Sequence, residues 1–356
     1  MNEEKLRKHI QDGTVIPAHP LALTADRKLD EASQRLLTRY YMASGAGGVA
    51  VGVHSTQFEI RNDDVQLYEP VLRLAKEEFD QASLDRPFAM VAGIVGTTDQ
   101  AIREAQLAAS LGYDFGLLSM GGLNDYSYSE LIRRAEKVGE IIPIFGFYLQ
   151  PAVGGQLLPY EFWKDFSEIP SVYAIKMAPF NRYQTIDVVR AVINSSRWKD
   201  ISLYTGNDDN IIADLLTEYA FSVKGEIRRK QIVGGLLGHW AVWTSKAVEL
   251  LDEIKSIRAG DAGIPAEMLS RNIEVTDANA VVFDVANDFH GCIPGIHEVL
   301  HRQGLLKGIW CLNPDETLSP GQSEELDRIH LNYPDMHDDD FVREFLKNVA
   351  MAKPGP

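Results

Sequence analysis

The chain contains little cysteine, fewer basic than acidic residues, and no long hydrophobic run. Its two cysteines, Cys292 and Cys311, cannot build a disulfide framework and are typical of a reducing compartment. Its 35 Lys and Arg face 51 Asp and Glu, a formal charge of −16, so the clustered basic residues that bind nucleic-acid phosphates are lacking. No run approaches the roughly 18 apolar residues of a membrane helix, and the charged N-terminus lacks a signal peptide's apolar stretch. These absences favour a cytoplasmic protein that binds neither nucleic acid nor membranes.

Short apolar runs alternate with amphipathic stretches along the first two-thirds of the 356 residues. Runs that are apolar throughout indicate strands buried on both faces, as in a parallel sheet wrapped by helices. Eight strand–helix units of about 30 residues each predict a (β/α)8 TIM barrel, an α/β fold. A doubly wound sheet is the alternative, but no GxGxxG follows the first strand. The apolar runs cover residues 14–23, 47–53, 88–95, 114–120, 141–149, 171–177 and 201–206, with an eighth somewhere in 219–240.

The predicted barrel, with a short N-terminal helix, occupies residues 1–250. Residues 251–356 have the pattern of helices with polar joins, and no linker rich in Pro, Gly or Ser precedes them. We therefore expect a C-terminal helical region that packs on the barrel. The active site of such a barrel lies at the C-terminal ends of the strands. That rule selects as candidates His54, Ser55, Thr56, Tyr148, Lys176, Gly206, Asn207, Asp208 and Asp209.

Lys176 lies in an otherwise apolar strand, where burial of an ammonium group is unfavourable and lowers its pKa. A neutral amine at a barrel mouth is a nucleophile for a carbonyl carbon and gives a Schiff base. The alternative is a lysine that extends to the rim and pairs with a loop acid. Tyr148 ends the preceding strand, so we expect its phenol to project next to Lys176 and to transfer protons. The alternative there is an aromatic that only caps the barrel.

These residues carry a family resemblance. Tyr148-Leu149-Gln150-Pro151, followed 28 residues after the tyrosine by Lys176 in Ala174-Ile175-Lys176, resembles the Tyr-x-x-Pro and Ile-Lys signatures of the dihydrodipicolinate synthase / N-acetylneuraminate lyase family. Tyr204-Thr205-Gly206-Asn207-Asp208 resembles its seventh-strand Gly-x-Asp, and residues 295–318 resemble its C-terminal helices. The resemblance covers residues 14–330 and implies a class I aldolase-type barrel.

In that family Lys176 would form a Schiff base with pyruvate or a related 2-oxo acid, and Tyr148 would be the proton-relay phenol. The resemblance implies a lyase or aldolase, with dehydration as a further possibility. It implies no cofactor beyond the covalent Schiff base, and no metal. It also implies a homo-oligomer, either a dimer or a tetramer.

Three segments depart from the family pattern. Where the family has Gly-Thr-Thr-Gly-Glu, this chain has His54, Ser55 and Thr56, which we expect to bind the substrate carboxylate. Val153 replaces the arginine of dihydrodipicolinate synthases, which argues against an aspartate-semialdehyde acceptor. Asp208 and Asp209 resemble the acids with which sugar-acid lyases hold hydroxyl groups, so a hydroxylated or neutral second partner is favoured. The family's Pro-Tyr-Tyr segment after the fourth strand is also missing.

Two alternatives remain for the function. His297-Glu298-Val299-Leu300-His301 matches HExxH, the pattern of a zinc-dependent hydrolase in which the two histidines bind zinc and the glutamate acts as general base. Lys307, however, stands where the longer pattern has its third ligand. The other alternative is a catalytically inactive barrel that only binds a ligand. The acidic run 334–340, which contains His337, is interpreted as a helix N-terminus.

Overall fold

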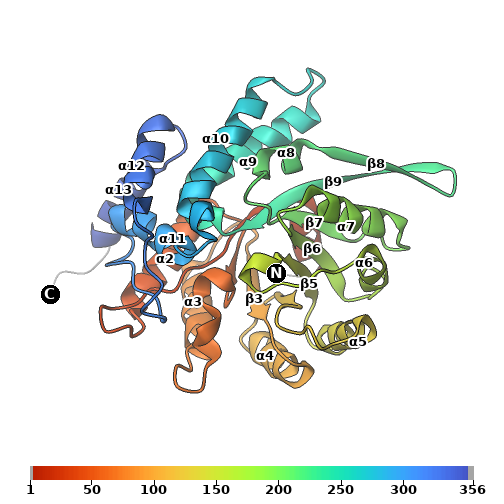
Figure 1. Ribbon diagram of the computed structural model, residues 1–356, viewed down its shortest axis with the longest axis horizontal. Helices are drawn as coiled ribbons and strands as arrows, with labels where there is room; N and C mark the ends of the chain where they lie inside the picture. Colours follow the sequence, from red (N-terminus) through yellow and green to blue (C-terminus); the bar gives the residue numbers. More distant parts are fainter. Residues whose placement is uncertain (1–2, 352–356) are drawn as a thin grey trace.

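Eight parallel strands form a nearly closed barrel in the computed structural model, which describes residues 3–351 (Figure 1). The hydrogen-bonded order is β1-β9-β7-β6-β5-β4-β3-β2, and a parallel bridge between Ala18 and Ala50 joins the two ends. The predicted (β/α)8 barrel is therefore confirmed. The barrel strands are β1 (Val15–Pro17), β2 (Gly48–Val51), β3 (Ala89–Ile94), β4 (Phe115–Ser119), β5 (Ile144–Leu149), β6 (Val172–Ala178), β7 (Ser202–Thr205) and β9 (Glu226–Leu237).

An outer ring of helices surrounds the strands (Figure 1). Side-chain caps start several of them: Asp30 accepts a hydrogen bond from the Ser33 amide, and Ser127 and Glu130 form a capping box. The ring comprises α2 (Glu31–Ala43), α3 (Tyr68–Ala82), α4 (Thr98–Ser110), α5 (Tyr128–Gly139), α6 (Tyr160–Phe166), α7 (Arg182–Asn194), α8 (Ile211–Leu216) and α9 (Thr244–Ala259). Short 3-10 helices lie at η1 (His54–Thr56), η2 (Phe58–Arg61), η3 (Pro151–Val153), η4 (His239–Ala241) and η5 (Val285–Asn287).

Alternation along the strands divides the core into two layers. In β5, Phe145, Phe147 and Leu149 belong to the cluster inside the barrel, whereas Ile144 and Tyr148 belong to the layer between strands and helices. Helix α1 (Glu3–Asp12), the predicted N-terminal helix, adds Leu6 and Ile10 to the inner cluster. The Tyr204 hydroxyl donates to the Ile10 carbonyl oxygen at 2.9 Å. The barrel interior is thus filled by side chains and is no channel.

The eighth apolar run contains two strands where one was predicted. Strand β8 (Glu218–Val223) pairs antiparallel with the first half of β9, and this hairpin projects from the barrel (Figure 1). Lys224 and Gly225 connect the two strands with φ of 52° and 85°. Two consecutive positive φ values characterise the tight turn that joins twisted antiparallel strands, and glycine at the second position favours it. The second half of β9 then enters the barrel beside β1 and β7.

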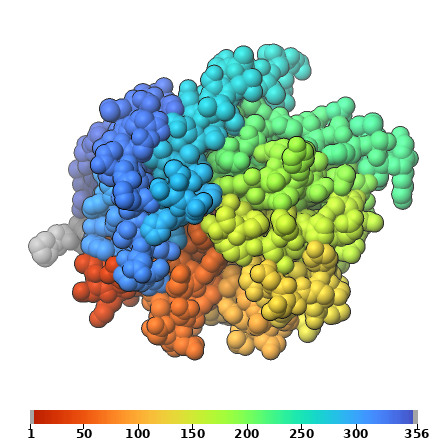
Figure 2. All heavy atoms as spheres, in the orientation of Figure 1, coloured from red at the N-terminus to blue at the C-terminus, as the bar shows by residue number. Residues whose placement is uncertain are grey.

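Four further helices make up the predicted C-terminal region, which begins beside the last helices of the ring, α8 and α9, and ends near α2 (Figures 1 and 2). They are α10 (Glu267–Val282), α11 (Cys292–Arg302), α12 (Gln322–Asn332) and α13 (Asp339–Met351). The predicted boundary at residue 250 falls inside α9, so the last helix of the ring ends at Ala259. Buried Asp338 connects the C-terminal region to the barrel. Its carboxylate accepts hydrogen bonds from the Tyr40 hydroxyl at 2.7 Å, the Gln303 side-chain amide at 2.8 Å and the Ser245 backbone amide at 3.2 Å.

Asp338→Ala is expected to lower the free energy of unfolding by about 3 kcal/mol, because it leaves several buried donors without an acceptor. Denaturant unfolding followed by tryptophan fluorescence measures the change. The matched control is Asp340→Ala, which removes an exposed carboxylate paired with Arg343 and has little effect. Equal stabilities of the two variants would show that Asp338 does not hold the C-terminal helices on the barrel.

Candidate active site

A narrow cavity of about 60 Å³ opens at the C-terminal ends of the barrel strands. It brings together five of the predicted site residues: His54, Ser55, Lys176, Gly206 and Asp208. The remainder of its lining is mostly apolar. The other lining residues are Ala18, Val53, Phe147, Leu149, Gln150, Val153, Ala178, Phe180, Gly238, Phe283, Phe289, Cys292 and Ile296.

Lys176 is the nucleophile candidate of this cavity. Its side chain is inside the barrel, with the residue 7 % exposed and Nζ 4.3 Å from the centre of the Phe147 ring. Within residues 3–351, no hydrogen bond or ion pair is formed by Nζ, so the alternative of a lysine paired with a loop acid is not observed. Burial lowers the Lys176 pKa to about 8, against the opposing effect of the Asp208 charge. A substantial share of the amine is therefore neutral near physiological pH.

Gly206 makes room for the lysine chain. A Cβ atom at this position would lie 2.5 Å from Cε of Lys176 and 2.8 Å from Cβ of Ala178. The Gly206 amide donates to the Met177 carbonyl oxygen at 2.7 Å, which fixes the end of β7 against β6. Any larger residue would displace the amine from its place in the cavity.

Asp208 is the acid that faces the lysine. It is buried, and its Oδ1 accepts a hydrogen bond from the His239 amide at 2.8 Å. Burial raises the Asp208 pKa to about 7, although the His239 amide and the Lys176 charge oppose the rise. A carboxyl that titrates near neutral pH can both accept and donate a proton during turnover.

The hydroxyls after β2 brace the barrel. Ser55 Oγ donates to the Ala18 carbonyl oxygen at 2.9 Å, and Thr56 Oγ1 donates to the His19 carbonyl oxygen at 2.7 Å. Thr56 lies outside the cavity lining, whereas Ser55 lines it and keeps lone pairs that can accept. His54 also lines the cavity, and burial together with the Lys176 charge lowers its pKa to about 4. Its imidazole is therefore neutral at pH 7.

The prediction that Tyr148 projects next to Lys176 is wrong, because the cavity neighbour of the lysine is Phe147. Phe147 and Lys176 are register partners, whereas Tyr148 pairs with Met177 in the outer layer. The Tyr148 ring packs 5.2 Å from the Trp163 ring of α6, and its hydroxyl accepts from the Leu158 amide at 3.3 Å. The β5–β6 register shifts between Ile144 and Phe145, and a shift of one residue decides which side chain faces inward.

Tyr148→Phe is expected to leave the rate of Schiff-base formation within about threefold of wild type and to lower the free energy of unfolding by about 1 kcal/mol. The reason is that the phenol is outside the cavity and forms one long hydrogen bond. Rapid-quench trapping and urea unfolding measure the two quantities. A loss of a hundredfold or more in trapping rate at unchanged stability would show that the Tyr148 phenol takes part in Schiff-base formation.

Asp209 also lies outside the cavity. The Thr276 hydroxyl donates to its backbone carbonyl oxygen at 2.8 Å, and burial and the Asp214 charge raise the pKa of its side chain. Sequence reasoning missed the aromatic part of the lining, above all Phe180, Phe283 and Phe289. Phe283 and Phe289 come from the C-terminal region, and no local pattern shows that this region reaches the barrel mouth.

The HExxH residues do not converge on one point. His297 is buried in α11, and His301 is exposed with Nδ1 3.1 Å from the Leu306 carbonyl oxygen. Glu298 pairs with Arg302 at 2.8 Å, and Lys307 pairs with Asp30 at 2.7 Å. Over the described range the pattern forms no metal-binding group.

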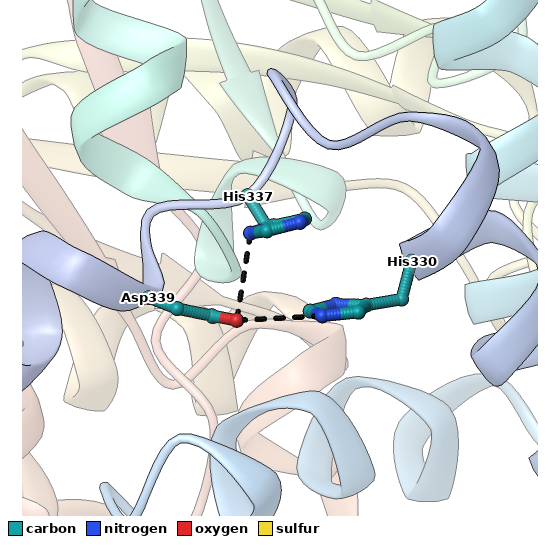
Figure 3. A group of neighbouring side chains, drawn as sticks. All are labelled: His330, His337 and Asp339. Atoms are coloured by element: carbon teal, nitrogen blue, oxygen red, sulfur yellow. Dashed lines mark ion pairs between the residues drawn. The ribbon is translucent and has the colours of Figure 1, made fainter.

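A different group, His330, His337 and Asp339, has its ligand atoms within 4.8 Å of one another (Figure 3). The His337 ring lies over the His330 ring, with centres 4.0 Å apart and planes 11° apart. Nitrogen lone pairs lie in the ring plane, so an ion about 2 Å from one nitrogen is far out of the other ring's plane. The stacked rings would have to separate before they could share an ion. Asp339, as predicted for this acidic run, begins α13.

Comparisons with known proteins support the fold. No family model and no curated protein matches the sequence. A prophage protein of the dihydrodipicolinic acid synthase family from E. coli K12, solved with pyruvate, is 18% identical, with 90% of this chain and 98% of that chain covered and a TM-score of 0.72. Dihydrodipicolinate synthase from Oceanobacillus iheyensis is 15% identical, with 93% and 97% covered and a TM-score of 0.70.

N-acetylneuraminate lyase from Fusobacterium nucleatum, complexed with pyruvate, is 16% identical, with 90% of this chain and 97% of that chain covered and a TM-score of 0.69. The resemblance seen in the sequence therefore extends to the three-dimensional fold of nearly the whole chain. In addition, none of the helices within residues 3–351 is both long enough and apolar enough to span a membrane.

Proposed function

We propose that the chain is a divergent member of the dihydrodipicolinate synthase / N-acetylneuraminate lyase family and a Schiff-base lyase or aldolase for pyruvate or another 2-oxo acid. The observation that carries the proposal is Lys176, an amine buried in the cavity at the C-terminal ends of the strands with its pKa lowered to about 8. The similar folds solved with pyruvate support the choice of a 2-oxo acid.

The first half of the reaction joins the 2-oxo acid to the lysine. The lone pair of neutral Nζ adds to the C2 carbonyl carbon, and the carbonyl oxygen takes a proton from Asp208. The Asp208 carboxylate then takes a proton from the nitrogen and passes it to the hydroxyl, which leaves as water, and an iminium remains. His54, a neutral donor in the cavity lining, binds the carboxylate of the substrate, and the Ser55 hydroxyl joins it by turning its proton away from the Ala18 carbonyl oxygen.

The second half breaks or forms the carbon–carbon bond. In the cleavage direction the Asp208 carboxylate takes the proton of the C4 hydroxyl, the bond between C3 and C4 breaks, and its electrons neutralise the iminium as an enamine. An aldehyde leaves. Protonation of the enamine at C3 and hydrolysis then release pyruvate and regenerate the amine. Asp208 thus transfers the protons in place of Tyr148, because the Tyr148 phenol lies on the outer face of β5 and outside the cavity.

Borohydride reduction in the presence of pyruvate, followed by intact mass and peptide mapping, tests the proposal. We expect one reduced pyruvyl adduct on Lys176. Absence of any adduct with pyruvate and with several larger 2-oxo acids would contradict it.

One outcome of this experiment favours the alternative function. An adduct without cleavage or condensation of any aldol would favour a catalytically inactive barrel that only binds a ligand.

The oligomeric state is a separate prediction. We expect a dimer or a tetramer, and sedimentation velocity measures which of the two forms.

A further inference from the structure

Two phenylalanines meet over the cavity that holds Lys176. Phe180 follows β6, and Phe289 lies between η5 and α11. Their rings are in edge-to-face contact, with centres 6.1 Å apart and planes at 62°. Both line the cavity, and both are partly exposed. The pair, called the aromatic clamp below, therefore joins a barrel loop to the C-terminal region.

Both residues have an unusual backbone. The φ angles are +51° at Phe180 and +67° at Phe289, in the left-handed region that bulky residues rarely adopt. Such conformations persist only where the surroundings impose them, and they cluster at ligand clamps and active sites. The fold thus imposes these two backbone conformations, although phenylalanine does not favour them.

Hydrogen bonds hold the two loops in these conformations. The Phe180 amide donates to Oδ1 of Asn207 at 3.1 Å, and Nδ2 of Asn207 donates to Asp214 at 3.0 Å. The Phe289 amide donates to the Asp284 carbonyl oxygen at 3.0 Å. The Asp284 carboxylate in turn accepts from the Asn287 side chain at 2.7 Å and the Gly291 amide at 2.8 Å. Both sides of the clamp are therefore preorganised.

The cavity lining combines polar and apolar side chains. His54, Ser55, Gln150 and Asp208 are the polar side chains that line the cavity together with Lys176. The clamp shares the lining with the apolar side chains Leu149, Val153, Phe283 and Ile296. Lys176 is the only basic side chain other than His54 in the lining. A hydroxylated or anionic substituent that contacts the clamp and these apolar side chains would lose its water without gaining hydrogen bonds from them.

We propose that the aromatic clamp selects acceptor aldehydes with an apolar aryl or alkyl substituent over polyhydroxylated or anionic ones. This inference rests on the proposed Schiff-base function. It replaces the hydroxylated partner that the sequence favoured, because Asp209 is outside the cavity and Asp208 accepts from the His239 amide and is assigned the proton transfers at the reacting atoms. The acceptor enters by turning the partly exposed Phe289 ring, since the cavity holds only about 60 Å³.

Condensation with pyruvate tests the clamp. We compare benzaldehyde and hexanal with glyceraldehyde and erythrose, and we expect kcat/KM to be at least about 100-fold higher for the apolar pair. Phe289→Gly, which removes the ring and tolerates positive φ, is expected to lower kcat/KM for benzaldehyde by about tenfold or more and to change that for glyceraldehyde little. Phe289→Leu keeps apolar volume and should restore part of the preference. Phe345→Ala, an aromatic truncation in α13, is the control and should leave the preference unchanged.

The outcomes separate the two proposals. The clamp proposal is overturned, while Schiff-base formation is supported, in two cases. In the first, the wild-type protein forms the pyruvate adduct but prefers glyceraldehyde or erythrose. In the second, it forms the adduct but condenses with none of the four aldehydes. An equal loss for all aldehydes in Phe289→Gly also overturns the clamp proposal. Absence of the reduced pyruvate adduct overturns the proposed function and the clamp with it.

Discussion

Lys176→Met is expected to abolish the borohydride-trapped pyruvate adduct and to lower aldol turnover by roughly 10⁴-fold or more, because no other group replaces the covalent nucleophile. Methionine preserves most of the side-chain volume beside Phe147, so the fold should persist. Circular dichroism and intact mass after reduction measure the fold and the adduct.

A second lysine, half-buried in β9, provides the matched control. Burial also lowers the Lys230 pKa to about 8, but its Nζ donates to the Trp198 carbonyl oxygen at 2.6 Å in the β8–β9 hairpin, away from the cavity lining. Lys230→Met should keep the full adduct. If the adduct survives in Lys176→Met and disappears in Lys230→Met, Lys230 is the nucleophile and the proposed role of Lys176 is wrong.

Asp208→Asn is expected to separate adduct formation from turnover. The Asp208 carboxylate raises the Lys176 pKa, so its removal moves that pKa below about 8. The neutral amine then predominates from a lower pH, and the rising limb of the pH profile for adduct formation shifts toward acid. Cleavage and condensation should nevertheless fall by roughly 10²–10⁴-fold, because the variant has no carboxyl group for the proton transfers.

Asp209→Asn is the control for this experiment, since it neutralises the next residue in the chain while leaving the cavity lining intact. Stopped-flow pyruvate binding between pH 5.5 and 9.5 gives the profile, and a coupled pyruvate assay gives turnover. Unchanged turnover in Asp208→Asn would assign proton transfer to another group, for which His54 in the lining is a candidate.

Local patterns in the sequence are sufficient to predict the barrel. Each strand buries both faces and each helix buries one, so the apolar runs mark the elements without knowledge of distant contacts. Placing candidates at the C-terminal strand ends also predicted the shared location of Lys176, Asp208 and His54, because parallel strands bring those ends to one edge.

What the sequence could not predict depends on register and on distant contacts. The register shift between β5 and β6 makes Phe147, and not Tyr148, the partner of Lys176, and apolar strands offer no polar alternation to reveal it. Phe289 reaches Phe180 over a separation of more than 100 residues, and no spacing rule connects them. Strand β8 escaped prediction because Lys224-Gly225 is a weaker turn signal than Asn-Gly or Asp-Gly.

Closure of the barrel has a consequence for how the chain is made. Val15 of β1 pairs with Gly235 of β9. The partner of the first strand is therefore synthesised about 220 residues later. At bacterial or eukaryotic elongation rates of roughly 5–20 residues per second, the ribosome needs on the order of 10–40 s to supply it. During this interval the edge of β1 that later pairs with β9 and the edge of the most recently made strand are open to pairing with other nascent chains. Helper proteins that shield these edges until residue 237 emerges should therefore raise the yield of the folded chain.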